Sequence, residues 1–285
     1  MPGSVTIVEV GPRDGLQNES ALVSTDAKVA FIEALADAGL PVVEATSFVS
    51  PSAVPQLADA DVLVPRIRRR DGVRYPVLVP NMRGMERAEA AGADAVAVFT
   101  AASETFTQRN IGMSIAGSLE AFEPVLARAA ALGWWRRGYV STAFGCPYEG
   151  DVAPAAVVRI TEALLDLGCN EVSIGDTIGI ARPRDVRDRC AALLARVSAE
   201  RIALHLHDTR GRALDNVEAG LEMGIASYDA SAGGTGGCPF APGAPGNLAT
   251  ESLCGLLDRL GIEHGVDVGA VEAAGLAMRA HLTGP

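Results

Sequence analysis

Two of the four histidines stand two residues apart, in the segment His205-Leu206-His207 at the end of an apolar run. Alternate side chains of a β-strand point to the same face, so both imidazoles are expected on one side of it. Paired imidazoles are common ligands of divalent cations. A hydrogen-bonded histidine pair without a metal is the alternative interpretation.

A carboxylate and a guanidinium follow the first β-rich run, at Asp14 and Arg13. Asp14 is the predicted third metal ligand, and this mixed nitrogen and oxygen set suits Mg²⁺, Mn²⁺ or another first-row ion better than a closed zinc site. A buried guanidinium beside a metal needs an anionic partner. Arg13 is therefore predicted to bind an anionic substrate group or an oxyanion, with a structural ion pair to Glu44 or Asp176 as the alternative.

Cys238 lies in the glycine-rich segment GGTGGCPF, residues 233–240. Glycines allow positive φ angles and close approach of the backbone to a ligand. A thiol there can donate or accept a proton when a nearby cation lowers its pKa. Cys238 is therefore a candidate catalytic residue, whereas helix-like surroundings predict a core position for Cys169, Cys190 and Cys254.

The elements that must position these groups are β-rich runs that alternate with Ala/Leu-rich stretches of helical period. The predicted strands are 5–10, 42–45, 74–79, 95–99, 138–141, 171–174, 202–207 and 227–230. Eight βα units predict an α/β fold, a (β/α)8 TIM barrel. An open doubly wound sheet is the alternative, but no GxGxxG motif follows the first strand.

The chemically interesting residues all follow predicted strands, where the catalytic face of a barrel lies. Asp14 follows the first strand, Glu44 lies in the second, Asp176 follows the sixth, and both histidines end the seventh. These residues are therefore expected at one mouth of the barrel. Glu44 and Asp176 are predicted either to hold Arg13 and the histidines in place or to touch the substrate.

Length and charge narrow the function classes. The 285 residues suit one barrel, so residues 1–285 are predicted to form a single catalytic domain. The net charge of −11 argues against nucleic-acid binding, which needs a basic surface. No apolar run reaches the roughly 18 residues of a membrane-spanning helix, so no membrane association is expected.

Cysteine usage indicates the compartment. The five cysteines are scattered and lack CxxC spacing, as expected in a reducing environment, and no export signal precedes the first strand. A cytoplasmic protein is therefore predicted.

Five segments, taken together, resemble the hydroxymethylglutaryl-CoA lyase family. They are VEVGPRDGLQNE at 8–19, EATSFVSP at 44–51, FGCPYEG at 144–150, SIGDTIG at 173–179 and GGCPF at 236–240. The resemblance covers about residues 5–262. This family is related to the isopropylmalate and homocitrate synthases, which share its TIM barrel and metal site.

The resemblance implies a retro-Claisen cleavage of 3-hydroxy-3-methylglutaryl-CoA to acetyl-CoA and acetoacetate. It assigns Asp14, His205, His207 and Asn247 to a divalent metal, Mg²⁺ or Mn²⁺. It gives Arg13 the role of stabilising an enolate and Cys238 that of protonating it, with Glu44 and Asp176 as supporting carboxylates.

The resemblance further implies an acyl-CoA substrate, a homodimer, and a role in leucine degradation and ketone body formation. A lyase for a longer-branched 3-hydroxyglutaryl-CoA is the main alternative. A related Claisen-condensing acyltransferase is less favoured, because no residues remain for a regulatory domain. A non-catalytic binding role fits poorly with a complete set of candidate site residues.

Overall fold

The computed structural model describes residues 1–237 and 246–283, and within them nine parallel strands form one sheet. The strands are β1 (Thr6–Glu9), β2 (Val42–Val43), β3 (Thr46–Ser47), β4 (Val77–Leu78), β5 (Ala95–Ala101), β6 (Trp135–Ser141), β7 (Glu171–Asp176), β8 (Ile202–Leu206) and β9 (Ser227–Ala230). Their order in the sheet is β2-β1-β9-β8-β7-β6-β5-β4-β3. The two end strands, β2 and β3, are therefore neighbours in the chain.

The run from 42 to 47 closes the sheet into a barrel. On one side β2 pairs with β1, and the Glu44 backbone N–H donates to the Glu9 carbonyl (2.8 Å). On the other side the Val43 N–H donates to the Arg74 carbonyl (2.9 Å), and β3 pairs with β4. The predicted (β/α)8 barrel is confirmed, and its second strand appears as two short pieces on either side of Glu44 and Ala45.

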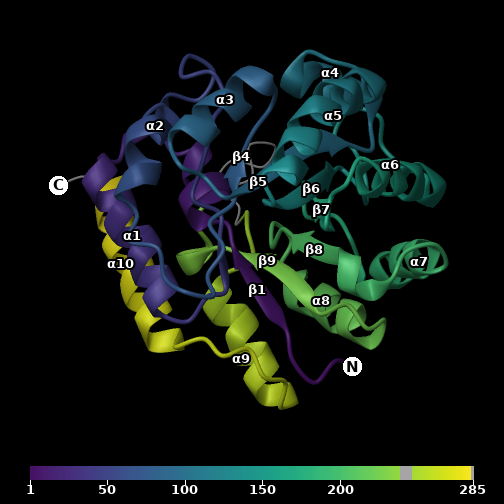
Figure 1. The fold of residues 1–285 in the computed structure, drawn as a ribbon. Helices are drawn as coiled ribbons and strands as arrows, with labels where there is room; N and C mark the ends of the chain where they lie inside the picture. The colour runs from purple at the N-terminus through teal and green to yellow at the C-terminus, as the bar shows by residue number, and fades with distance from the viewer. Residues whose placement is uncertain (238–245, 284–285) are drawn as a thin grey trace.

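Helices surround the strands (Figure 1). The α-helices are α1 (Thr25–Asp37), α2 (Ala60–Leu63), α3 (Met82–Ala90), α4 (Glu104–Ile111), α5 (Ile115–Ala131), α6 (Pro154–Asp166), α7 (Pro183–Leu194), α8 (Ala213–Glu222), α9 (Thr250–Leu260) and α10 (Val268–Thr283). Short 3₁₀ or π segments are η1 (Gly11–Gly15), η2 (Pro55–Leu57), η3 (Val64–Arg66), η4 (Ala199–Arg201) and η5 (Ala232–Gly234). None of the helices in the described part of the chain is long and apolar enough to cross a membrane.

The layer between helices and strands is apolar, and α1 illustrates how it forms. The Ser24 side chain accepts a hydrogen bond from the Ala27 N–H (3.3 Å) and so begins the helix. Ile32 and Leu35 lie on one face and are fully buried. Each such side chain contributes about 1.5–3 kcal/mol when removed from water. Cys169, Cys190 and Cys254 are buried too, so their predicted core positions are confirmed.

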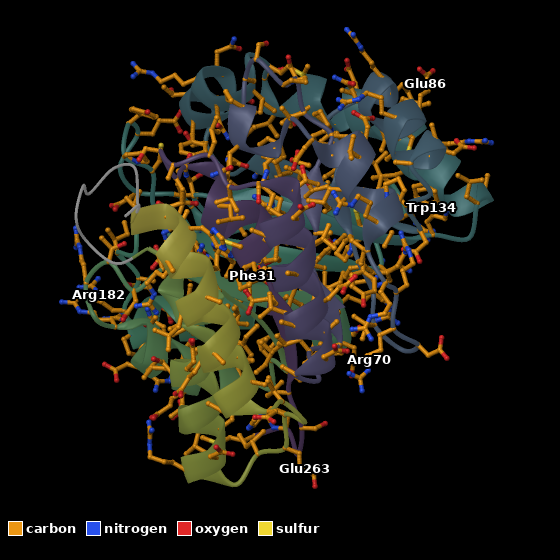
Figure 2. All side chains as sticks on the ribbon, turned by 90° about the vertical axis from the view of Figure 1, so that its left-hand side faces the viewer. Phe31, Arg70, Glu86, Trp134, Arg182 and Glu263 are labelled. Carbon is orange, nitrogen blue, oxygen red and sulfur yellow. The ribbon has the colours of Figure 1, made fainter. Side chains whose placement is uncertain are left out.

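The last helix, α10, lies beside the first, α1. Figure 2 faces this pair, with Phe31 of α1 labelled at their contact. Gly275 of α10 lets the helix approach the η5 turn, because a Cβ atom there would lie 3.1 Å from the Gly233 nitrogen. The C-terminal helix therefore supports the turn from which the glycine-rich segment starts.

Candidate metal centre and active site

A single turn of π-helix, η1, carries Arg13 and Asp14 over the carboxyl end of β1. The Glu9 side chain accepts the Gly11 N–H (2.8 Å), and the Gly15 N–H donates to the Val10 carbonyl (3.1 Å). A Cβ atom at Gly11 would lie 2.6 Å from a Glu9 carboxylate oxygen. Only glycine fits there without displacing Glu9, so the local sequence determines where Arg13 and Asp14 stand.

Asp14, His205 and His207 form a candidate metal centre. Each offers one ligand atom, and these atoms lie within 4.8 Å of one another. The two histidine Nε2 atoms are 3.1 Å apart. Two adjacent ligands of an octahedral ion with bonds of about 2.1 Å are separated by about 3.0 Å, the bond length multiplied by √2. The three residues therefore fit a small divalent cation.

The protonation of these three groups suits a cation. Burial and the neighbouring His205 lower the pKa of His207 to about 3, so its ring is neutral. Burial opposes ionisation of Asp14, but Arg13 and then His205 hold the pKa of that carboxyl well below its usual range. Burial also disfavours the charged form of His205, yet the hydrogen bond to Asp229 and the charge of Asp14 raise its pKa. Asp14 and His207 thus offer lone pairs at neutral pH.

Asn247 reaches the same centre from the far side of the glycine-rich segment. Its side-chain nitrogen donates to Asp14 Oδ2 (2.9 Å) and to the Thr235 carbonyl (3.2 Å), and its backbone forms a bridge with His207. The residue that the resemblance assigns as a fourth ligand is therefore in contact with Asp14. Its ligation of a metal stays a prediction.

Arg13 lies between two carboxylates at the mouth of the barrel. Its Nη1 atom is 2.7 Å from Asp14 Oδ1 and its Nη2 atom is 2.7 Å from Glu44 Oε2. Burial opposes its charge, but Glu44 and Asp14 outweigh this and raise the pKa of Arg13 further. The Arg13 Nε atom has no hydrogen-bond partner among the described residues. The alternative ion pair with Glu44 is present, and Arg13 also lines the pocket.

Glu44 and Asp176 occupy different places. Glu44 is fully buried against Arg13, and burial raises its pKa even though Arg13 opposes this. Asp176 ends β7 and accepts the backbone N–H groups of Ile180 (3.0 Å) and Ala181 (2.9 Å). Burial raises the pKa of Asp176 to about 6. Of the two carboxylates, Glu44 pairs with Arg13, whereas Asp176 orders the turn that follows its own strand.

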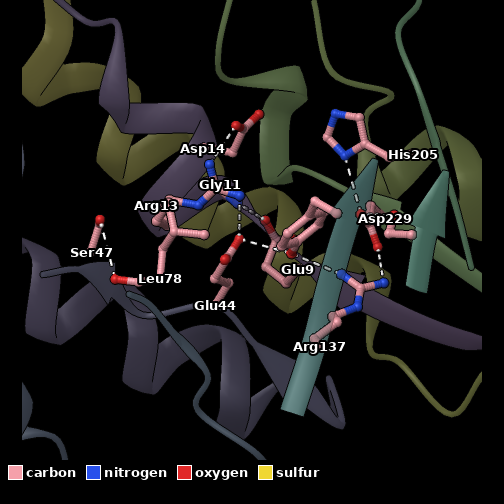
Figure 3. A network of polar contacts seen from close by, with 12 residues as sticks. Glu9, Gly11, Arg13, Asp14, Glu44, Ser47, Leu78, Arg137, His205 and Asp229 are labelled. Atoms are coloured by element: carbon pink, nitrogen blue, oxygen red, sulfur yellow. Dashed lines mark hydrogen bonds and ion pairs between the residues drawn. The ribbon is translucent and has the colours of Figure 1, made fainter. Parts of the chain in front are cut away.

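Three further site residues were not identified from the sequence: Tyr139, and also Arg137 and Asp229, which are labelled in Figure 3. All three are buried inside the barrel, and Asp229 accepts a hydrogen bond from His205 Nδ1 (3.2 Å). Asp229 could have been recognised as a site residue. The last two strands pair in parallel, and this pairing sets Asp229 beside His205. A charged residue in the middle of an apolar strand marks an inward-facing polar position.

Backbone hydrogen bonds link the described residues that stand before and after residues 238–245. The Asn247 N–H donates to the Gly236 carbonyl (3.2 Å), and the Asp208 N–H donates to the Gly246 carbonyl (2.7 Å). A Cβ atom at Gly246 would lie 1.8 Å from the Gly236 oxygen, so the close approach requires glycine. Cys238 lies outside the described residues, and its catalytic role stays a prediction.

The pocket at this mouth combines the polar centre with an apolar wall. Leu78, Phe99 and Phe106 form the wall, and the backbone of Gly236 and Gly237 closes another side. Arg13, Asp14 and both histidines line the same pocket. A barrel with an arginine and a candidate divalent-metal centre at the carboxyl ends of its strands defines a TIM-barrel protein equipped to bind an oxygen-rich anion.

Comparison with known proteins specifies the family. A family model described as HMGL-like matches residues 4–276. The mitochondrial hydroxymethylglutaryl-CoA lyase of Bos taurus is 52% identical over 274 residues, which cover 96% of this chain and 84% of that protein. The chain belongs to the HMGL-like family.

Two solved structures extend the comparison. An HMG-CoA lyase from Brucella melitensis has a TM-score of 0.97 and 51% identity, and the match covers 99% of this chain and all of that one. An HMG-CoA lyase from Acinetobacter baumannii, in complex with coenzyme A and 3-methylmalate, has a TM-score of 0.93 and 37% identity over 99% of this chain and 92% of that one. The likeness therefore includes a relative with coenzyme A bound.

Proposed function

We propose that the protein is a hydroxymethylglutaryl-CoA lyase, a carbon–carbon lyase that cleaves 3-hydroxy-3-methylglutaryl-CoA to acetyl-CoA and acetoacetate. The observation that carries the proposal is the approach of Asp14, His205 and His207 within 4.8 Å, directly beside Arg13 and in one pocket. About half of the residues are identical to those of a named lyase over nearly the whole chain.

The reaction makes three demands on the site: the tertiary hydroxyl loses its proton, the C2–C3 bond breaks, and C2 gains a proton. A divalent ion held by Asp14, His205 and His207, with Asn247 beside them, would lower the pKa of the hydroxyl and orient it. Mg²⁺ and Mn²⁺ are the proposed ions, because the resemblance implies them and the Asp14 carboxylate offers the oxygen ligand that both prefer. The choice between them is a matter for metal analysis of the purified protein.

Arg13 is the proposed stabiliser of the negative charge that develops when the bond breaks. Cleavage turns C3 into the ketone of acetoacetate and leaves an enolate on the thioester fragment. A fixed cation beside the enolate oxygen acts as an oxyanion hole does. Arg13 lines the pocket, and its buried Nε donor has no partner among the described residues, which supports this role.

Proton transfer needs one group to accept the hydroxyl proton and another to protonate C2. A metal-site histidine or a neighbouring carboxylate is the proposed acceptor, and Cys238 is the proposed donor to C2. Gly237, which precedes Cys238 in the sequence, lines the pocket. Glu44 and Asp176 are proposed as supporting carboxylates, and the ion pair of Glu44 with Arg13 supports its part.

The direct test is to incubate the purified protein with 3-hydroxy-3-methylglutaryl-CoA and measure both products. Chelated protein should be inactive and should regain activity with Mg²⁺ or Mn²⁺, giving acetyl-CoA and acetoacetate in equal amounts. Cys238→Ala and His205→Ala should each lose the activity. No turnover by folded, metal-loaded protein would rule out this substrate, and longer-branched 3-hydroxyglutaryl-CoA thioesters would be tested next.

The oligomeric state, the cellular location and the metabolic role are also proposed. A homodimer is proposed from the resemblance and is tested by light scattering of the purified protein. A cytoplasmic location is proposed from the scattered cysteines, and cell fractionation tests it, since the bovine relative is named mitochondrial. A role in leucine degradation and ketone body formation would follow from the activity.

A further inference from the structure

Arg137 lies inside the barrel beneath the candidate metal centre, and no part of its side chain is exposed. A buried guanidinium is costly unless every donor has a partner. Here the partners come from three directions. Nε contacts Glu171 (2.7 Å), Nη1 donates to the Tyr139 hydroxyl (2.8 Å), and Nη2 contacts Asp229 (2.6 Å). Arg137 does not line the pocket, so it has no route to the substrate.

One branch from Arg137 leads to a candidate metal ligand. Asp229 uses one carboxylate oxygen for Arg137 and the other for His205 Nδ1 (3.2 Å) and the Ser173 hydroxyl (2.8 Å). Because a carboxylate only accepts, His205 must donate from Nδ1. The lone pair of a neutral His205 then lies on Nε2, which faces His207.

The other branch leads to Arg13. The Tyr139 hydroxyl accepts from Arg137 and donates to Glu44 Oε2 (3.1 Å), and the same Glu44 oxygen pairs with Arg13 (2.7 Å). A hydroxyl has one hydrogen to donate, so Arg137 on its acceptor side directs that hydrogen to Glu44. The Tyr139 ring also lies under both guanidinium groups, 5.4 Å from Arg13 and 4.9 Å from Arg137.

We propose that Arg137 is the positioning residue that fixes both halves of the candidate active site: through Asp229 it sets the orientation and tautomer of His205, and through Tyr139 and Glu44 it sets the position of Arg13. Figure 3 shows Arg137 next to Asp229, with His205 on the other side of Asp229, and Arg13 next to Glu44. The inference rests on the proposed function for its catalytic part, while its effect on His205 is measured without any substrate.

The test is Arg137→Lys, which keeps the buried charge but cannot reach Asp229, Tyr139 and Glu171 at once. Its Mn²⁺ dissociation constant, measured by electron paramagnetic resonance, should rise about tenfold to a hundredfold. The chain has only four histidines, so two-bond ¹H–¹⁵N spectra of the metal-free protein at pH 9 can follow His205. The wild type should show the Nδ1–H tautomer alone, and the variant a mixture of the two tautomers.

The matched control is Arg196→Lys, in an exposed ion pair with Glu162 (2.8 Å), which should change neither measurement. Tyr139→Phe removes the hydroxyl that joins Arg137 to Glu44 and leaves the Asp229 branch in place. It should lower kcat about tenfold or more, with the Mn²⁺ affinity of the wild type. Because the Tyr139 side chain also lines the pocket, KM is measured beside kcat to separate a lost substrate contact from a displaced Arg13. If Arg137→Lys does not fold, Ser173→Ala replaces it, because it loosens Asp229 alone and should weaken Mn²⁺ binding.

Folded Arg137→Lys with wild-type Mn²⁺ affinity and a single His205 tautomer would overturn the proposal. So would Tyr139→Phe with an unchanged kcat, in the second branch. Failure of the wild type to cleave 3-hydroxy-3-methylglutaryl-CoA would instead overturn the proposed function, and the affinity and tautomer measurements would still decide the role of Arg137.

Discussion

Two buried arginines lie between carboxylates: Arg13 at the mouth of the barrel, and Arg137 in the layer beneath it, which we call the floor and which includes Tyr139 and Asp229. The two arginines differ in which of their nitrogen atoms lack a hydrogen-bond partner. At the mouth, Arg13 pairs with Asp14 and Glu44, lines the pocket, and keeps an Nε donor without a partner among the described residues. On the floor, Arg137 has partners at all three nitrogen positions.

The difference separates two uses of the same chemistry. An arginine whose three nitrogens all have partners is held in a fixed position, and Arg137 does not line the pocket where a substrate would bind. An arginine that keeps one N–H donor unpaired can stabilise a negative charge that develops on the substrate. The mouth is therefore expected to govern catalysis and the floor to govern geometry and stability, and four measurements test this division.

The largest effect is expected from removal of the metal at the mouth. Chelation should reduce kcat by more than about a thousandfold, because a bound ion supplies several kcal/mol of charge stabilisation. Steady-state assays of acetoacetate release, before and after addition of Mn²⁺, measure it. Full activity after chelation, with metal analysis confirming an apo-protein, would exclude the metal from the chemistry.

The next effect concerns Arg13. The variant Arg13→Met should lower kcat about a hundredfold to a thousandfold, the usual loss when one oxyanion donor is removed. A matched control is Arg189→Met, which removes another buried arginine that contacts the Val152 carbonyl (3.0 Å) and lines no part of the site pocket. The control should lower the melting temperature but leave kcat unchanged. Equal losses of kcat in both variants would contradict a specific role.

Glu9 tests the structural side through pH. It is fully buried, and burial raises its pKa to about 7 in spite of hydrogen bonds from Thr250, Ala232 and Gly11. Because the native state holds its proton more tightly, the contribution of Glu9 to stability is complete below about pH 4.5. It is then lost as the pH rises through 7, by about 3 kcal/mol in total.

The variant Glu9→Gln should therefore show a flatter pH profile of unfolding free energy between pH 5 and 8, measured with urea. Glutamine can still accept the Gly11 and Ala232 N–H groups through its oxygen and donate to the Thr250 hydroxyl. A profile parallel to that of the wild type would mean that Glu9 is ionised throughout this range.

The smallest effect is expected at Asp176, which lies at the mouth of the barrel but makes its hydrogen bonds within the protein, as Arg137 does. Asp176→Asn loses one acceptor for the Ile180 and Ala181 N–H groups. It should cost about 1 kcal/mol of unfolding free energy and leave the Mn²⁺ affinity unchanged. A large rise in KM without loss of stability would instead place Asp176 against the substrate.

The sequence was sufficient for the barrel and for most of the mouth. Alternation predicted that His205 and His207 share a face, and strand ends predicted that Asp14 would meet them; the structure brings the three together. Pairing between Glu44 and Arg13 was one of two alternatives, and the other carboxylate, Asp176, proved to bond its own turn. Local patterns do not say which of two inward carboxylates reaches a distant arginine.

The sequence did not predict the buried cluster around Arg137, and the reason is physical. The fifth strand was predicted to span 138–141, but β6 starts at Trp135 and carries Arg137 inside. A buried arginine is recognisable only once its carboxylates are known to face it from other strands. Pairing of β6 with β7 brings Glu171 next to Arg137, and this is information about register, not composition.

The hydrogen bond that joins Gly236 to Asn247 at the base of the glycine-rich segment has an implication for protein engineering. The described residues on either side of 238–245 are held together next to Asp14, which lies on η1. Residues 238–245 can therefore be replaced as a unit in a chimera. Chimeras that carry the corresponding stretch of a relative are expected to keep the Mn²⁺ affinity of the parent.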